Sequence, residues 1–364
     1  MKNTFGQNLS VTLFGESHGP AVGAVIDGIA PGVKVDEEKM AAYLSKRRPS
    51  SIIDTPRREM DNFQILSGVF NGRTTGTPIC IMIPNENTKS KDYTYGLARP
   101  SHADYTAHVK YHGYEDYRGG GHFSGRITAA LVAVGGILLP ALEEIGISIG
   151  THILKCGEIS DQAFTNVAAD IDALKKANFP VLDNVAGEKM IEYITAAANS
   201  MDSVGGITQT AVSGIEAGIG EPWFDSVESM LSHILYSLGG VKGVEFGQGF
   251  SFADKHASEV NDAFRMEDGK VVTTTNNNGG INGGITNGMP IVFQCSVKPT
   301  PSIAQQQNTI DFCTGKNAEI AIHGRHDPAI IRRICPVIDS VTAIALCDLM
   351  AGRYGTDFLP RGNK

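Results

Sequence analysis

The sequence lacks any run of about 18 consecutive apolar residues, the length that a helix needs to cross a membrane. The beginning of the chain also lacks the basic segment, apolar block and small-residue cleavage site of a secretory signal. We therefore expect a cytoplasmic protein that does not bind a membrane.

Metal-binding cysteine motifs are missing as well. The six cysteines are far apart, and none belongs to a CxxC pair or to a Cys/His spacing that would hold zinc. Isolated thiols are typical of a reducing compartment. We expect reduced cysteines and no metal site.

Two common nucleotide-binding motifs are absent. No GxGxxG with a later acidic residue lies between a strand and a helix, and no GxxxxGK[ST] occurs, which disfavours a dinucleotide fold and a P-loop. GESHG at 15–19 matches the letters GxSxG, but β-rich runs flank it on both sides, so the sequence predicts no strand-to-helix nucleophile elbow there. Ser17 and His18 are neighbours, and adjacent residues rarely aim at each other as nucleophile and base, so they do not indicate a serine hydrolase.

Positive charge is scarce overall but locally concentrated. The formal net charge is -8, which argues against a nucleic-acid surface. Basic residues nevertheless cluster at Lys46, Arg47 and Arg48 and, around a triple glycine, at Arg118 and Arg126. Guanidinium groups match carboxylate and phosphate oxygens two at a time, so this pattern indicates a small polyanionic ligand.

What is abundant is glycine. The chain has 42 glycines, which gather at residues 113–125, 213–220, 239–249 and 279–288. These stretches predict loops in which the backbone passes close to a neighbour or a ligand.

Between the loops, β-rich runs predict strands at residues 10–14, 21–26, 78–83 and 290–297. Helical periodicity predicts helices at residues 36–48, 125–139, 190–201, 226–238 and 336–351. We expect Pro140 to kink or interrupt the second helix, and Pro336 to occupy the first turn of the last. Because strands and helices mix without regular βαβ spacing, the sequence predicts an α+β fold with mainly antiparallel sheets.

Three segments place ionisable side chains beside small residues: GESHG at 15–19, GGGHFSGR at 119–126 and GRHDP at 324–328. Nine further motifs accompany them, namely FGQ at 5–7, KRRP at 46–49, TTGTP at 74–78, HADYT at 102–106, DYRGGG at 116–121, GIGEP at 218–222, KGVE at 242–245, GINGGI at 280–285 and KPTPS at 298–302. With these motifs in this order, the chain resembles the chorismate synthase family over nearly its whole length.

The resemblance implies one domain over residues 1–364, with long helices sandwiched between mainly antiparallel β-sheets and residues 158–200 as a peripheral excursion. It implies a lyase that converts 5-enolpyruvylshikimate 3-phosphate into chorismate and phosphate, the final common step of the shikimate pathway to aromatic amino acids. It also implies reduced FMN as cofactor and assembly as a homotetramer. The compact length resembles the monofunctional kind, which receives reduced flavin from a separate flavin reductase, so that NADPH acts only indirectly.

For catalysis the resemblance points to His18, His102 and Asp327. Histidine has an unperturbed pKa near 6.5, which suits proton transfer at neutral pH. By the resemblance, His18 lies near the departing phosphate, His102 near the flavin, and Asp327 near flavin N5 as a base or relay. The structural alternatives are that the histidines support glycine turns and that Asp327 forms an ordinary surface ion pair.

For binding, the resemblance points to a substrate set and a cofactor set. The substrate set is Ser17, Arg47, Arg48, Arg126 and Arg325, of which Arg47 is also linked, more weakly, to NADP. The cofactor set is His122, Phe123, Ser124, Gly239, Gly240, Gly283, Lys298, Pro299, Thr300, Pro301, Ser302 and Arg325. Glycines let a flavin lie against backbone, and Lys298 and the hydroxyls of Thr300 and Ser302 suit a phosphate.

The chain departs from its relatives at several positions. Many relatives have Arg-Ser-Ser or Arg-Ala-Ser where His122, Phe123 and Ser124 stand, which replaces a cationic contact by a titratable one. Asp339 stands where glutamate is usual, and glycines occupy positions 239 and 240, a pair that often includes Asn and Ala. None of these changes removes a residue expected to handle protons.

Two other functions fit the same resemblance. One is a flavin or phospho-ligand binding protein that keeps the fold without turnover, which the loss of the proton-handling residues would have favoured. The other is a bifunctional enzyme with its own NADPH-driven flavin reductase activity, which would turn over with NADPH and oxidised FMN alone.

Overall fold

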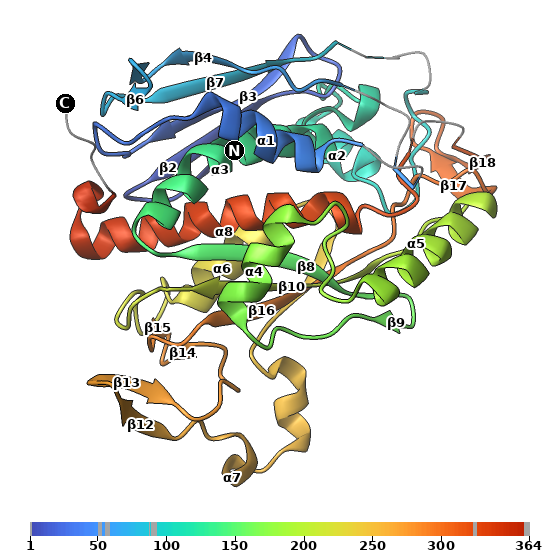
Figure 1. The fold of residues 1–364 in the computed structure, drawn as a ribbon. Helices are drawn as coiled ribbons and strands as arrows, with labels where there is room; N and C mark the ends of the chain where they lie inside the picture. The colour runs from blue at the N-terminus through green and yellow to red at the C-terminus, as the bar shows by residue number, and fades with distance from the viewer. Residues whose placement is uncertain are drawn as a thin grey trace.

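A computed structural model describes residues 2–49, 53–54, 59–86, 88, 93–322 and 326–359. Two five-stranded antiparallel sheets enclose a layer of long helices (Figure 1). The first sheet runs in the order β1 (Thr4–Phe5), β2 (Ser10–Gly15), β3 (Ala21–Asp27), β7 (Ile79–Pro84) and β4 (Gln64–Ser67). The second runs in the order β11 (Val241–Phe246), β16 (Ile291–Val297), β10 (Gly206–Ser213), β8 (Ser148–Cys156) and β9 (Ile159–Ser160).

The helices between the sheets are α1 (Glu37–Arg47), α3 (Thr128–Glu144), α6 (Val227–Leu235) and α8 (Ile331–Tyr354). Helix α3 lies against β3 and β7 of the first sheet, α8 lies against β8 and β10 of the second, and the two helices pack on each other. Their apolar side chains join those of both sheets in one core. The predicted sandwich of helices between antiparallel sheets is therefore confirmed.

Two adjacent glycines let three helices approach closely. A Cβ atom on Gly135 would lie 2.2 Å from Ser340 Oγ on α8, and one on Gly136 would lie 2.8 Å from Met40 Cα on α1. Larger residues would push the helices apart, so the absence of side chains at these two positions sets the spacing of the helical layer.

Residues 125–144 and Ile331–Tyr354 are each long and apolar enough to span a membrane. However, 89% and 94% of their most apolar windows are buried inside the fold. Their composition is that of central core helices, and α8 contacts α1, α3, α6, β8 and β10.

The prediction for Pro336 was wrong, and of the two outcomes predicted for Pro140 the interruption does not occur. Helix α3 continues through Pro140 to Glu144 without interruption, and α8 begins at Ile331, so that Pro336 lies inside it rather than in its first turn. Tertiary packing of these buried helices outweighs the loss of one backbone hydrogen bond. The predicted strands and the other helices are present, with ends shifted by a few residues.

The remaining elements surround the sandwich. They are β5 (Val69–Phe70), β6 (Arg73–Thr74), α2 (Asp104–Tyr111), η2 (Arg118–Phe123), η3 (Gly125–Ile127), α4 (Val167–Lys176), α5 (Asn184–Asn199), η4 (Gly249–Asp254), α7 (Ala257–Val260), β12 (Phe264–Glu267), β13 (Lys270–Thr273), β14 (Ile281–Asn282), β15 (Ile285–Thr286), β17 (Gln307–Asp311), β18 (Lys316–Ile320) and η5 (Thr356–Phe358). Helices α4 and α5 occupy the segment 158–200, and α4 packs on β8 and β10. The single-domain boundaries stay a prediction.

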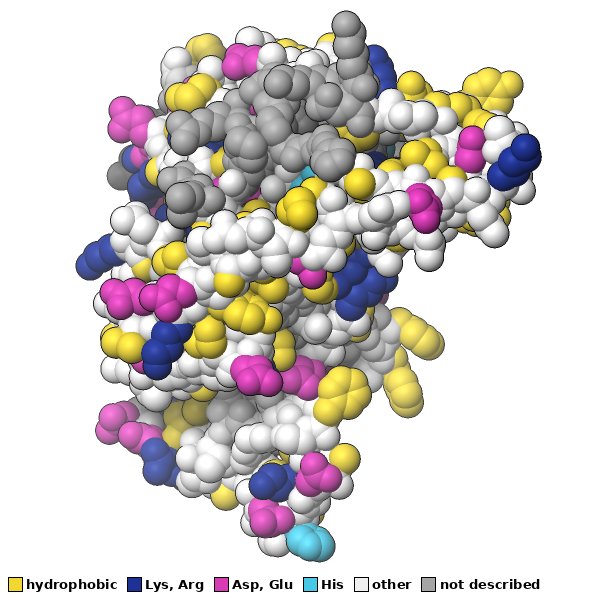
Figure 2. Space-filling view, turned by 90° about the vertical axis from the view of Figure 1, so that its right-hand side faces the viewer, with side chains coloured by type: hydrophobic (Ala, Val, Ile, Leu, Met, Phe, Trp, Pro, Cys, Tyr) yellow, Lys and Arg dark blue, Asp and Glu magenta, His cyan; other side chains and the backbone are white. Residues whose placement is uncertain are grey.

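All six cysteines are free thiols. On the face drawn in Figure 2, Lys and Arg side chains are interspersed with Asp and Glu side chains rather than gathered into one basic surface.

Candidate active site

The triple-glycine segment brings the two predicted catalytic histidines together. All three glycines have positive φ, at 62°, 82° and 52°. A Cβ atom on Gly119 would lie 2.5 Å from the His18 imidazole, and one on Gly120 would lie 3.1 Å from the His102 imidazole. Adjacent residues of one loop therefore contact both rings, and only glycine permits this approach.

An ion pair orients His102. Its Nδ1 lies 2.8 Å from Asp104 Oδ1 and 3.1 Å from Arg99 Nη2, and Arg99 holds Asp104 through Nε and Nη2 at 2.8 and 2.7 Å. An ionised carboxylate only accepts hydrogen bonds, so Nδ1 carries the proton and Nε2 is the basic nitrogen, on the side of Gly120.

The two partners affect each other's protonation. Burial lowers the pKa of His102, against the hydrogen bond that the ring donates to Asp104, so the ring is neutral at pH 7. Burial opposes ionisation of Asp104, but hydrogen bonds from Arg99 and His102 outweigh it and lower the pKa of Asp104. The pair is thus a fixed carboxylate behind a neutral imidazole.

An asparagine links the His18 loop to Arg126. Asn85 Nδ2 donates to the carbonyl oxygens of Glu16 and Gly19, at 2.9 and 2.8 Å, on either side of His18. Its Oδ1 accepts from Arg126 Nε at 2.9 Å. These hydrogen bonds fix the position of the His18 loop relative to the buried guanidinium of Arg126.

Two of the predicted substrate arginines share one carboxylate. Arg126 Nη1 and Arg47 Nη1 both pair with Asp61, the second at 3.4 Å, and all three side chains are buried. Arg47 also donates to Thr128 Oγ1 and to the carbonyl of Gly125, at 2.8 and 2.7 Å. Three of the five N–H groups of Arg47 are thus used, which leaves it donors for a ligand.

Asp327 belongs to the same cluster. Arg333 Nη1 pairs with Asp327, while Arg333 Nε donates to the carbonyl of Arg47 at 2.8 Å. Burial lowers the pKa of Arg47 to about 9, with Asp61 acting against it, and Asp327 is among the charges that act on Arg47. We call Arg47, Arg126, Asp61, Arg333 and Asp327 the arginine cluster.

The KPTPS segment leaves the second sheet next to His102. Val297, the last residue of β16, pairs with Gly206 and Val241 in the neighbouring strands. Lys298 Nζ then donates to the carbonyl of Ser101 at 2.6 Å, and Lys298 N donates to the carbonyl of Gly240 at 2.9 Å.

The rest of this segment is anchored beside the arginine cluster. The carbonyl of Thr300 accepts from Ser203 Oγ at 2.6 Å, and the amide of Val204 donates to the carbonyl of Pro328, next to Asp327. The hydroxyl of Thr300 is buried and has no hydrogen-bond partner within the described part of the chain. Pro299, Pro301 and Ser302 belong to this same segment, and the Ser302 side chain is buried.

Two of the residues that follow the triple glycine, His122 and Phe123, share a cavity with the His102 ring. His122 Nδ1 donates to the carbonyl of Gly15 at 2.7 Å, and Ser124 Oγ accepts from the amide of Arg126 at 3.3 Å. His122 and Phe123 line a cavity of about 350 Å³ together with His102 and Gly120. Ser17, which is fully buried, fastens its loop to this segment through its amide and the carbonyl of Gly121, at 3.0 Å.

Two predicted residues lie elsewhere. Arg48 donates to the carbonyl of Met60 at 2.9 Å and lines a second cavity rather than the arginine cluster. Gly283 lies in the β14–β15 turn. Gly280, just before β14, lies close to the carbonyl of Pro290, which precedes β16. Since Lys298 follows β16, the length of that strand separates Gly283 from the KPTPS segment (Figure 1). Arg325 lies outside the described residues. Gly239 precedes Gly240, and a Cβ atom on Gly239 would meet nothing within 4 Å.

The residues that the sequence analysis missed are those that position others: Asp61, Asn85, Arg99, Asp104 and Arg333. Asp104 stands inside the HADYT motif, and its two-residue step from His102 was a usable signal. No local pattern marks Asp61, because its two arginine partners lie 14 and 65 positions away.

Comparison with known proteins decides the family. The family model described as chorismate synthase matches residues 9–351. The chain belongs to the chorismate synthase family.

Relatives called chorismate synthase are similar along almost their whole length. The protein from Pyrococcus abyssi is 45% identical over 346 residues, which cover 94% of this chain and 96% of the relative. That from Methanosarcina mazei is 43% identical over 351 residues, 96% of each. A solved structure described as a crystal structure of chorismate synthase has a TM-score of 0.77 at 26% identity and covers 97% of this chain and 94% of its own.

Membership of the chorismate synthase family makes the chain a lyase that acts on a phosphate ester. The arrangement described above suits such chemistry, because it joins two imidazoles, a carboxylate and several guanidinium groups through a continuous set of contacts.

Proposed function

We propose that the chain converts 5-enolpyruvylshikimate 3-phosphate to chorismate and phosphate by anti 1,4-elimination and that it requires reduced FMN. The observation that carries this proposal is the contact of the His18 and His102 rings with adjacent glycines beside the arginine cluster. The substrate carries two carboxylates and a phosphate, and buried guanidinium groups held by carboxylates are preorganised to bind them.

In this proposal each group has one task. Arg47 and Arg126 bind substrate anions, and His18 donates a proton to the departing phosphate. Asp327 accepts the proton that leaves the ring, and Arg333 fixes its orientation. His102 presents neutral Nε2 toward the cofactor, since burial lowers its pKa and Asp104 holds Nδ1.

The KPTPS segment fits a flavin phosphate. Thr300 Oγ1 is a buried hydroxyl with no partner among the described residues. Lys298 brings an ammonium group, and Gly239 has open space where a Cβ atom would stand. Burial and the charge of Lys242 lower the pKa of Lys298, as expected of a cation that awaits an anion. Reduced FMN would supply electron density to the substrate and recover it afterwards. The chain would hold substrate and cofactor together and exclude water.

Four further properties follow from the family and are part of the proposal. The chain acts in the cytoplasm, assembles as a homotetramer, receives reduced flavin from a separate reductase, and uses NADPH only through that reductase. The weaker link between Arg47 and NADP receives no separate support from geometry, because the two remaining N–H groups of Arg47 suit any anion and do not single out NADP.

The test is anaerobic turnover of 5-enolpyruvylshikimate 3-phosphate with dithionite-reduced FMN, followed by chorismate absorbance and phosphate release. His18→Gln should lower turnover by about 10²- to 10⁴-fold. His112→Asn is a matched control, because His112 is exposed at a left-handed position that asparagine tolerates. Folded protein that makes no chorismate would reject the proposal, and aerobic turnover with NADPH and oxidised FMN alone would show an intrinsic reductase.

A further inference from the structure

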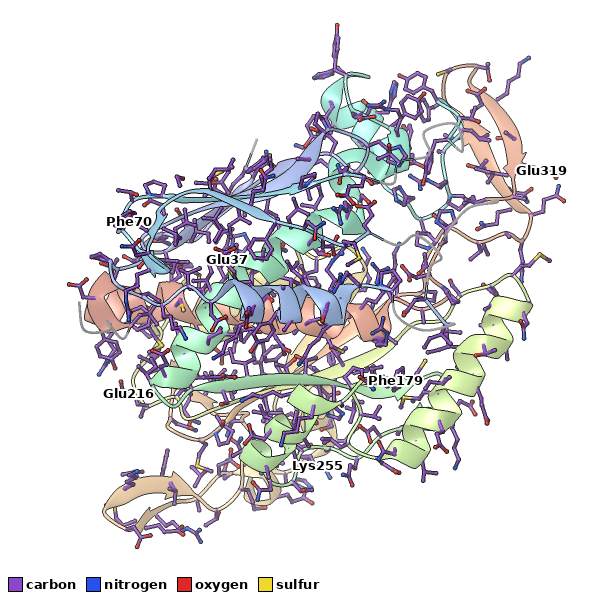
Figure 3. The ribbon with its side chains drawn as sticks, turned by 45° about the horizontal axis from the view of Figure 1, so that its top comes forward. Glu37, Phe70, Phe179, Glu216, Lys255 and Glu319 are labelled. Atoms are coloured by element: carbon purple, nitrogen blue, oxygen red, sulfur yellow. The ribbon has the colours of Figure 1, made fainter. Side chains whose placement is uncertain are left out.

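A second cavity, of about 550 Å³, lies between the C-terminal end of α1, the start of α8, α4 and β8. In Figure 3, α1 runs from Glu37 alongside α8, and Phe179 marks the segment that follows α4. We call it the α1–α8 cavity and define it by Tyr43, Lys46, Arg48, Thr151, Leu174 and Asp339. Nothing in the proposed reaction uses it, and its volume suits a small organic molecule.

One wall of the α1–α8 cavity holds two cations that lack carboxylate partners. Lys46 Nζ donates to the carbonyl of Lys175 at 3.0 Å, and Arg48 Nη1 donates to the carbonyl of Met60 at 2.9 Å. Within the described part of the chain neither forms an ion pair, whereas Arg332 in the same lining is paired with Asp54. Burial lowers the pKa of Lys46, so an anion that reached it would stabilise its charged form.

The same cavity holds a carboxylate, Asp339, with one hydrogen-bonded oxygen, close enough to Lys46 for the two charges to act on each other. Asp339 Oδ1 accepts from Thr151 Oγ1 at 2.6 Å, and Thr151 in turn contacts Thr210 Oγ1 at 2.9 Å. No hydrogen bond to Asp339 Oδ2 exists among the described residues. Asp339 is half-buried and lines the cavity, so its second oxygen suits a ligand that brings a hydrogen-bond donor.

The rest of the lining is apolar. Aliphatic surface in the lining comes from Ile149, Ile171, Leu174 and Pro180. A ligand that satisfies all three regions carries an anionic group, a cationic or hydroxyl donor and an apolar body. An α-amino acid combines these within one small molecule.

We propose that the α1–α8 cavity binds an α-amino acid with an apolar side chain. The ligand carboxylate contacts Lys46 and Arg48, its ammonium group contacts Asp339, and its side chain lies on Ile171 and Leu174. The cavity is separate from the arginine cluster, although Arg47 lies between Lys46 and Arg48 and turns to the other side of α1.

Affinity should depend on pH through Asp339. Burial raises the pKa of Asp339 to about 7, against the hydrogen bond from Thr151 and the charges of Lys46 and Lys175. Tyr43 on α1, Glu143 on α3, and Cys335 and Arg332 on α8 also face this region. With that pKa, only about one Asp339 in ten is ionised at pH 6, so binding of an ammonium group should weaken about tenfold between pH 8 and pH 6.

Calorimetric titration of the protein without flavin or substrate tests this, with L-phenylalanine, 3-phenylpropionate and phenethylamine as probes. At pH 8, L-phenylalanine should bind at least about tenfold more tightly than either analogue, each of which lacks one charged group. Lowering the pH to 6 should weaken L-phenylalanine about tenfold and leave 3-phenylpropionate unweakened.

Variants locate the binding. Asp339→Asn should remove the pH dependence and the preference for L-phenylalanine over 3-phenylpropionate. Glu192→Gln, which removes an exposed carboxylate on α5 outside the lining, should change neither. Lys46→Met should weaken the binding of both carboxylate probes, L-phenylalanine and 3-phenylpropionate. This variant tests the site if Asp339→Asn does not fold. No binding at millimolar L-phenylalanine, equal affinity for all three probes, or binding unaffected by Lys46→Met would overturn the inference. Since no catalytic component is present, these outcomes are independent of turnover.

Discussion

Replacing Gly119 with alanine places a methyl group against the imidazole of His18. Gly119 has φ of +62°, and a Cβ atom there would lie 2.5 Å from both Cδ2 and Nε2 of the ring and 3.0 Å from Ser17 Oγ. Ordinary contacts between such atoms are about 3.5 to 4.0 Å. The ring must therefore retreat by roughly 1 Å.

The retreat sets the expected loss of activity. A catalytic group misplaced by about 1 Å can cost about 10²-fold in rate. The left-handed backbone adds a separate cost of about 1 to 2 kcal/mol in stability, because alanine tolerates positive φ poorly. We therefore expect Gly119→Ala to fold with a moderately lower Tm and to turn over about 10²-fold more slowly than the parent.

The control for backbone strain is Gly269→Ala in the β12–β13 turn. Gly269 has φ of +76°, and a Cβ atom there meets nothing within 4 Å. Both variants should lose similar stability, and only Gly119→Ala should lose turnover with 5-enolpyruvylshikimate 3-phosphate and reduced FMN. If turnover of Gly119→Ala stays within about threefold of Gly269→Ala, the placement of His18 against Gly119 does not govern the reaction.

Three further changes probe other contacts. Asp104→Asn removes the carboxylate that favours protonated His102, so turnover should fall by about 10- to 10²-fold and the His102 limb of the pH–rate profile should move to lower pH; an unmoved limb would contradict this. Gly135→Ala should lower the free energy of unfolding by about 1 to 3 kcal/mol in denaturant titrations, since overpacking against Ser340 exceeds the helix-propensity gain; greater stability would show that the helices can separate freely. The pKa of Asp339 is about 7 in the folded state and 3.8 in the unfolded state, so the folded state binds more protons and stability falls as pH rises from about 4 to 7. Thermal unfolding of Asp339→Asn should not show this decline, and the variant should be more stable than the parent at pH 8.

The sequence by itself determined the family, the α+β class, the strands with β-rich composition and the helices with strong apolar periodicity. These features are local or motif-based, because a short window carries the hydrophobic pattern and each motif occupies a few consecutive positions. The same local patterns misplaced the start of α8 at Pro336, since burial of this helix compensates for a backbone hydrogen bond that a solvated helix could not lose.

Only the tertiary structure decided which side chains meet. It placed the His18 and His102 rings on adjacent glycines, paired Arg126 with an aspartate 65 positions away, and turned Arg48 away from Arg47 although they are neighbours. The reason is that contacts between distant residues depend on how helices and sheets pack, which no short window of sequence specifies, whereas neighbours in a chain take their directions from the backbone and diverge.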